Sequence, residues 1–166
     1  MSVARELANL RSIPTNGNIL LDYTAGDALT SGACNIAMGL NALTAATDNC
    51  GNIAIGKSAL AVSDGAADNN IAIGHTAMGA TAVTGEYNNM IGNNTGDALL
   101  AGSYNVGLGS QAMGAVTSGD NNVGIGNTAL GGPTTGDDNI GIGRLSADAL
   151  TSGACNIAIG VNTLGA

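Results

Sequence analysis

The sequence contains no Phe and no Trp and only three Tyr, yet 45% of its 166 residues are hydrophobic. The apolar residues are therefore almost entirely Ala, Ile, Leu, Val and Met. Globular cores usually gain much of their buried area from aromatic rings. The lack of rings predicts an interior too narrow to hold them, filled instead by stacked aliphatic side chains.

Charged residues are also scarce and mostly of one sign: four Lys and Arg stand against twelve Asp and Glu, a net charge of −8. Such a chain does not neutralise phosphates, which excludes nucleic acid as a partner. The longest apolar runs, such as residues 59–62, are far shorter than the roughly 20 residues that span a bilayer, so no membrane insertion is expected. The N-terminus lacks the basic and apolar regions of a secretory signal, and we expect the chain to be assembled in a cytoplasm.

Residues for catalysis are few. His75 is the only His, and the equivalent positions of the repeat described below hold unrelated residues, which indicates a solvated loop. No Ser–His–Asp or Cys–His set and no phosphate-binding loop is present, so we predict no enzyme, no catalytic residue and no cofactor. An acidic row, formed by Asp48, Asp68, Asp120, Asp137 and Asp138, is a candidate Ca²⁺ site. Because the regular nonapeptide of calcium-binding β-rolls is missing, we favour a structural role and no metal.

The odd cysteine count argues against a disulfide framework. Cys34 and Cys155 hold the same repeat position seven turns apart, roughly 33 Å at one strand spacing per turn, too far to bridge within a chain. A bridge between Cys34 and Cys50 on adjacent turns stays open but is less favoured. We expect all three to be small buried apolar residues.

The feature that organises the chain is the repeat Asn-Ile-Ala-Ile-Gly, seen in its clearest form at residues 52–56. Its closing position recurs at residues 22, 39, 56, 74, 92, 109, 126, 143 and 160, with spacings of 17 or 18. The first copy ends in Asp22, and the copy at 88–92 has Asn89 in place of the first aliphatic residue. A short fixed period of this kind predicts a solenoid, here of nine turns over residues 17–166.

Large and small residues alternate within each repeat, which predicts a short β-strand. We expect the large residues, such as Ile53 and Ile55, to face the core. The small residue between them is then expected to face neighbouring subunits, because stacked small residues usually mark the close approach of another backbone. This predicted trimer contact row consists of Ala37, Ala54, Ala72, Gly107, Gly124, Gly141 and Ala158. Leu20 and Met90 are its two exceptions.

Two further rows are structural. A second apolar row follows the closing glycine, at Leu43, Leu60, Met78, Met113, Leu130 and Leu164. The Asn row, from Asn18 to Asn156, is predicted to form a ladder in which each amide bonds to the next turn.

Residues 1–16 differ from the repeats. Val3, Leu7 and Leu10 are spaced for one face of a short helix that Pro14 ends. Arg5 and Arg11 also lie there. We predict a helical segment that either caps the solenoid or anchors it to a partner through these five residues.

The repeat Asn-Ile-Ala-Ile-Gly-x-x-Ala-Leu resembles the head repeat of trimeric autotransporter adhesins and is similar to the Asn- and Gly-rich repeats of bacteriophage tail fibres. The resemblance covers about residues 17–166. It implies an all-β fold, a left-handed parallel β-roll with three chains side by side, and a location on a cell or virion surface.

Departures from the adhesins favour the phage side. We expect no export signal, stalk or membrane anchor, and no tip domain after residues 163–166, which lie inside the ninth turn. The chain is then the proximal piece of a fibre, a short spike on the capsid surface, or a roll whose last turn is the exposed end. We therefore expect a homotrimeric structural virion protein, assembled in the host cytoplasm and attached to a tail or capsid protein through residues 1–16. A tail fibre for host attachment, with a surface receptor or glycan as partner, is the first interpretation, and a spike decorating the capsid is the second.

The alternatives of another class are an adhesin head and a left-handed β-helix acyltransferase. In the acyltransferases a hexapeptide repeats on all three faces, whereas here only one hexad per turn, as at residues 55–59, fits that pattern.

Overall fold

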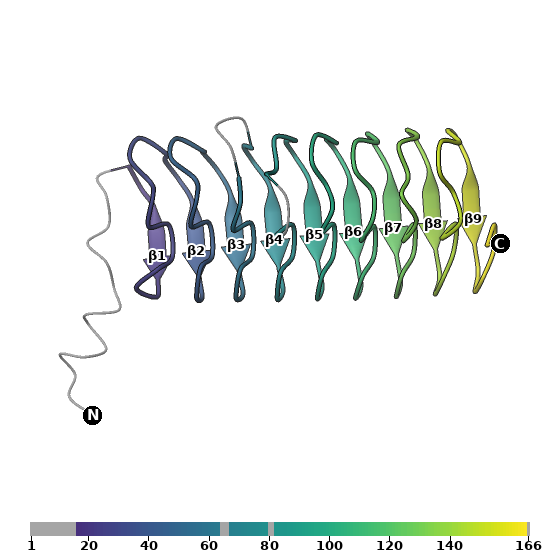
Figure 1. Cartoon of the computed structure of the whole chain (residues 1–166), viewed down its shortest axis with the longest axis horizontal. Helices are drawn as coiled ribbons and strands as arrows, with labels where there is room; N and C mark the ends of the chain where they lie inside the picture. Colours follow the sequence, from purple (N-terminus) through teal and green to yellow (C-terminus); the bar gives the residue numbers. More distant parts are fainter. Residues whose placement is uncertain (1–15, 64–66, 80–81, 166) are drawn as a thin grey trace, which may run out of the picture.

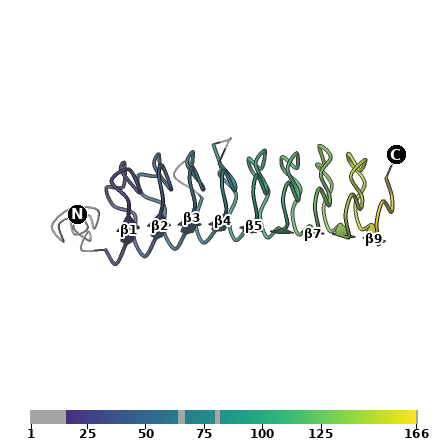
Figure 2. The same cartoon turned by 90° about the horizontal axis from the view of Figure 1, so that it is seen from below.

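The computed structural model describes residues 16–63, 67–79 and 82–165. Within these ranges the chain forms nine three-residue parallel strands, joined in chain order into one sheet. The strands are β1 (Ile19–Leu21), β2 (Ile36–Met38), β3 (Ile53–Ile55), β4 (Ile71–Ile73), β5 (Asn89–Ile91), β6 (Val106–Leu108), β7 (Val123–Ile125), β8 (Ile140–Ile142) and β9 (Ile157–Ile159). The predicted parallel β-solenoid is confirmed. The turns lie side by side from β1 to β9 (Figure 1), and the strands line one side of the roll, opposite the loops (Figure 2).

The described residues contain no helix, and hence none that could cross a bilayer. The helix predicted at the N-terminus, with Val3, Arg5, Leu7, Leu10 and Arg11, lies outside the described residues.

The repeat length follows from how the turns stack. Strands β2 and β3 pair in register, with Ile36 opposite Ile53 and Ala37 opposite Ala54. The loops also bond from turn to turn, as where the Thr76 N–H donates to Lys57 O at 2.9 Å. Because each turn satisfies the backbone of the next, its perimeter is fixed, and the period of 17 or 18 residues is the result.

The side of the sheet that faces the core is the reverse of the prediction. The small residues of the predicted trimer contact row point into the chain's own interior, where Ala37, Ala54 and Ala72 are completely buried. The whole row is buried in the single chain: Ala37, Ala54, Ala72, Gly107, Gly124, Gly141 and Ala158. The expectation that it meets neighbouring subunits is therefore corrected, and the large residues of each strand point outward instead.

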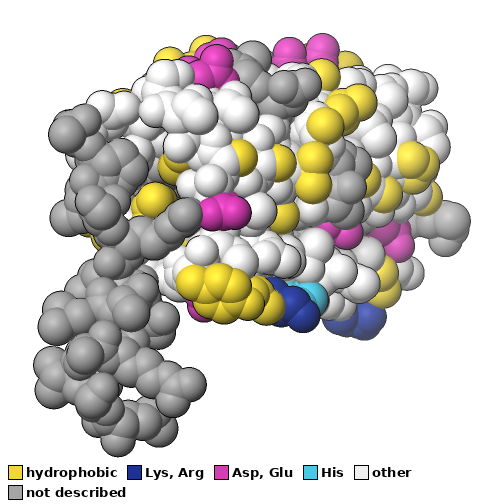
Figure 3. Space-filling model, turned by 60° about the vertical axis from the view of Figure 1, so that its left-hand side comes forward, with side chains coloured by type: hydrophobic (Ala, Val, Ile, Leu, Met, Phe, Trp, Pro, Cys, Tyr) yellow, Lys and Arg dark blue, Asp and Glu magenta, His cyan; other side chains and the backbone are white. Residues whose placement is uncertain are grey.

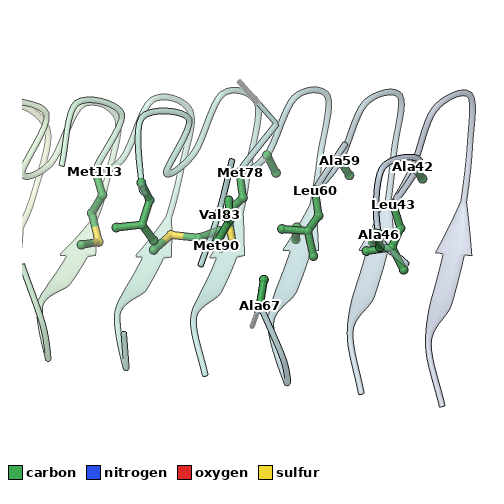
Figure 4. Close-up of a cluster of buried hydrophobic side chains, with 14 of the residues drawn as sticks. Ala42, Leu43, Ala46, Ala59, Leu60, Ala67, Met78, Val83, Met90 and Met113 are labelled. Carbon is green, nitrogen blue, oxygen red and sulfur yellow. The ribbon is translucent and has the colours of Figure 1, made fainter. Parts of the chain in front are cut away.

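The physical reason is the width of the interior. A Cβ added at Gly124 would lie 2.7 Å from Met113 Cγ, and one added at Gly141 would lie 3.1 Å from Leu130 Cγ. The predicted second apolar row fills the interior from the loop side, and Leu43, Leu60, Met78 and Met113 point into this space (Figure 4). Leu164, in the last turn, is 51% exposed. One large side chain per turn occupies this space, so the strand contributes a small one.

The two exceptions, Leu20 and Met90, obey the same volume rule. Four residues after their repeats close, where six of the other seven turns have Leu or Met and the turn of β8 has Ala147, these turns have Gly26 and Gly96. A Cβ at Gly26 would lie 2.8 Å from Leu20 Cδ2, and a Cβ at Gly96 would lie 3.0 Å from Met90 Cγ. Large and small residues have thus exchanged places across the interior, and the core volume is retained.

The predicted asparagine ladder is present and buried. The Asn35 backbone N–H donates to Asn18 Oδ1 at 2.8 Å, and the Asn52 N–H donates in turn to Asn35 Oδ1 at 2.9 Å. From Asn18 to Asn139, each amide nitrogen also donates to a backbone carbonyl 14 or 15 residues further along the chain, as where Asn105 Nδ2 donates to Gly119 O at 2.8 Å. The Asn row therefore ties neighbouring turns together and also holds the two sides of each corner.

Candidate assembly surface

The outward face of the sheet carries two continuous rows of large apolar side chains. The first and third residues of each strand form them, and in-register pairing aligns each row along the roll. The first outer row is Ile19, Ile36, Ile53, Ile71, Asn89, Val106, Val123, Ile140 and Ile157. The second outer row is Leu21, Met38, Ile55, Ile73, Ile91, Leu108, Ile125, Ile142 and Ile159.

These rows form an uncovered apolar face. Each outer residue is half-buried or exposed, with Ile91 at 40% and Leu108 at 45% even in the middle of the roll. Asn89 is the only polar member. Contiguous apolar surface on this scale is rare on monomeric proteins and typically marks an interaction site. Sequence reasoning found the rows but placed them on the wrong side, because alternation does not show which face is inside.

Two rows of residues, all exposed except the half-buried Gly51 and Leu40, border this face. The leading edge row holds the residue just before each ladder Asn: Gly17, Cys34, Gly51, Asn69, Tyr87, Tyr104, Asn121, Asp138 and Cys155. The trailing edge row holds the residue just after each closing position: Tyr23, Leu40, Lys57, His75, Asn93, Ser110, Asn127, Arg144 and Val161. Every leading-row residue has a left-handed backbone, as at Cys34, with φ 58°, and Gly17, with φ 74°.

The acidic row takes part in the hydrogen bonds of the leading corner, which is the bend of each turn just before the ladder Asn. Asp68 Oδ1 accepts the Cys50 N–H at 2.7 Å, Asp120 Oδ1 accepts the Ser103 N–H at 2.8 Å, and Asp137 Oδ1 accepts the Asp120 N–H at 2.9 Å. Asp48 and Asp138 are exposed. No group of three or more His, Cys, Asp or Glu able to hold a metal ion is found among the described residues. The bonds give three of these carboxylates a structural role.

The expectation that all three cysteines are buried is wrong. Cys34 and Cys155 are exposed, Cys50 is half-buried, and all three are free thiols. Cys50 takes the place of an Asp in the corner ladder, because its Sγ accepts the Ala33 N–H at 3.4 Å.

Other surface features lie along the edges of the apolar face or on the loop side. His75 is exposed, with Nδ1 3.0 Å from Thr76 Oγ1. The rings of Tyr87 and Tyr104 stack in the leading edge row, with centroids 5.1 Å apart. An open polar hollow of about 240 Å³ lies on the loop side, lined by Asn94, Asp97, Gln111, Gly114, Thr128 and Gly131. The Lys, Arg and His side chains gather along the lower edge of the molecule in Figure 3.

Comparison with known proteins gives no relative for this chain: no family model matches it, and neither the curated proteins nor the solved structures contain a significant match.

Proposed function

We propose that the protein is a homotrimeric structural β-roll, a fibre or spike of a bacteriophage particle, in which the outer face of the sheet packs around a threefold axis parallel to the roll. The observation that carries this proposal is the pair of aliphatic outer rows along the whole length of the sheet. The trimer first expected from the resemblance is retained, but its contact surface is now these rows.

The energetic argument supports assembly. Fully burying a Val, Leu, Ile or Met side chain is worth about 1.5–3 kcal/mol. Completing the burial is therefore worth about 1 kcal/mol for a half-exposed side chain and about 0.5 kcal/mol for one that is already mostly buried. With every position but Asn89 apolar, the two outer rows supply on the order of 10 kcal/mol per copy by the same measure. The cost of lost translational and rotational freedom is about 4–15 kcal/mol for each association step. A trimer takes two such steps, so three faces together supply at least as much as assembly costs.

The two outer rows on each sheet suit an assembly in which three sheets face a central threefold axis. Around a threefold axis the first outer row of one copy meets the second outer row of the next, so each apolar side chain gains apolar neighbours. Such a contact joins different surfaces of the two copies. Three copies close into a ring when each is related to the next by a third of a full rotation about the axis. The left-handed winding implied by the resemblance belongs to the same proposal.

The assembly is tested by light scattering on the purified chain, with two matched leucine variants. Leu108, in the second outer row, is 45% exposed, and Leu100, in a loop, is 46% exposed. We expect the wild-type protein to have three times the protomer mass of 16.0 kDa. Leu108→Asp is expected to lower that mass at micromolar protein, whereas Leu100→Asp leaves it unchanged. A wild-type monomer, or equal behaviour of the two variants, refutes the proposed contact.

The virion role rests on the resemblance and is tested separately. Electron microscopy of the source particles with a gold-labelled antibody distinguishes the locations. Label on the tail supports a host-attachment fibre, with residues 1–16 as the anchor to the particle. Label spread over the head supports the second candidate, a capsid decoration. Particles without label refute both and favour the adhesin or acyltransferase alternatives.

A further inference from the structure

In four of the nine turns, those of β2, β7, β8 and β9, the residues at the two edges match each other in chemistry. In the turn of β2, Cys34 on the leading edge goes with Leu40 on the trailing edge, and in the turn of β9, Cys155 goes with Val161. These are the turns with apolar residues at both edges.

The polar turns match in the same way. In the turn of β8, Asp138 goes with Arg144, beside a second acidic residue, Asp137. In the turn of β7 an amide goes with an amide, Asn121 with Asn127.

The remaining cations have no acidic partner in the leading edge row, but each shares its turn with an acidic residue close to that edge. Lys57 lies in the turn of β3 with Asp48, and His75 lies in the turn of β4 with Asp68. Every Lys, Arg and His of the described residues thus lies on the trailing edge of a turn with an acidic residue near its leading edge, whereas the turns of Glu86 and Asp120 have no cation.

Contact within one chain does not explain this match. Asp138 and Arg144 stand six residues apart along an extended segment, about 20 Å at roughly 3.3 Å per residue. They lie at opposite edges of the sheet, and both are exposed. A correspondence between two rows that do not touch in the chain points to contact in an assembly.

We infer that the leading edge of one copy meets the trailing edge of the next copy, turn against equal turn, and that this seam sets the rotation and the vertical register of the trimer. The inference rests on the proposed assembly around an axis parallel to the roll, since such a rotation brings opposite sheet edges together at the same height. The two edge residues of one turn differ only slightly in height along the roll. The chain climbs about 4.8 Å in each 17-residue turn, so the six residues from one edge to the other climb about a third of that, or roughly 1.7 Å.

The seam and the outer rows have different roles. The outer rows are nearly uniform, so sliding one copy along another by a turn costs little of their apolar contact. The edge rows change from turn to turn, and such a slip would place Arg144 beside Asn121 or Cys155 instead of Asp138. Charged and polar groups at an interface commonly fix register and exclude wrong pairings in this way.

The test is cysteine cross-linking of the full-length chain with a short bis-maleimide. The background carries Cys34→Ala, Cys50→Ser and Cys155→Ala, which remove the three thiols and keep the two edge positions apolar. Tyr104→Cys and Ser110→Cys, in the turn of β6, are then introduced together, because neither residue belongs to a matched pair. Cys is suited to position 104, where φ is 60°, because Cys34 and Cys155 adopt φ 58° at the same place.

We expect covalent dimers and trimers on denaturing gels. Two controls accompany the pair: either cysteine alone, and Tyr104→Cys combined with Tyr23→Cys, whose turns are offset by about 24 Å along the roll. None of these controls is expected to cross-link. An unlinked pair in a chain that light scattering shows to be trimeric overturns the seam and leaves the trimer standing. Equal cross-linking in the offset control overturns the turn-against-turn register. A monomeric background chain refutes the proposed assembly itself.

Discussion

Replacing one residue of the asparagine ladder tests how the turns are held together. Asn122 is completely buried. Its Oδ1 accepts the backbone N–H of Asn139 at 2.9 Å and Asn139 Nδ2 at 3.1 Å, and its own Nδ2 donates to Gly136 O at 3.0 Å. Asn122→Ala removes all three bonds and leaves the Asn139 N–H and the Gly136 carbonyl buried without these partners.

The magnitude follows from the groups left without partners. A buried donor or acceptor that loses its partner costs about 1–3 kcal/mol, so the two backbone groups together predict a loss of about 2–6 kcal/mol in the free energy of unfolding. The control is Asn127→Ala, because Asn127 Nδ2 makes an exposed bond to Ser110 O at 3.1 Å. Water replaces that bond, and the expected loss is about 0.5 kcal/mol or less.

The assay is equilibrium unfolding in urea at one fixed protomer concentration, since association makes the midpoint depend on concentration. The slope with urea should stay the same for wild type and both variants, so that the shift in midpoint reports stability. A loss for Asn122→Ala no larger than that for Asn127→Ala would show that the ladder does not hold the turns together.

Two further variants examine the interior and the loop backbone. Gly124→Met alone is expected to cost about 1–3 kcal/mol through overpacking, and Leu130→Gly alone about 2–5 kcal/mol through the cavity it opens. The double variant copies the turn of β5 and should lose clearly less than the sum of the two in urea unfolding; strict additivity would contradict the volume exchange. Thr128 has a left-handed backbone with φ 55°, which is unfavourable for a β-branched residue. Thr128→Asn should therefore raise the free energy of unfolding by about 0.5–1 kcal/mol and so raise the thermal midpoint. Thr135→Asn, at a position whose φ is not positive, should leave the midpoint unchanged. Equal shifts of the midpoint in the two variants would argue against backbone strain at position 128.

The sequence alone determined the architecture, because the stacking of similar turns requires the same residue types at the same position of every turn. The fixed period predicted the solenoid and its turns, and the Asn row predicted the ladder that runs from Asn18 to Asn156. The apolar row that includes Leu43 and Leu60 was recognised from its spacing, and the structure places these two residues inside. Each of these predictions depends on the spacing of one residue type, which the printed sequence shows directly.

Only the tertiary structure decided which face of the strand points inward. Alternation at Ile53, Ala54 and Ile55 defines two faces, but the choice between them depends on how much room the opposite side of the turn leaves. That room is taken by Leu60 and its equivalents, so the small residue turns inward and the two large ones form the outer rows. The edge match was hidden for the same reason, since Asp138 and Arg144 become members of two facing edges only when the orientation of the sheet is known.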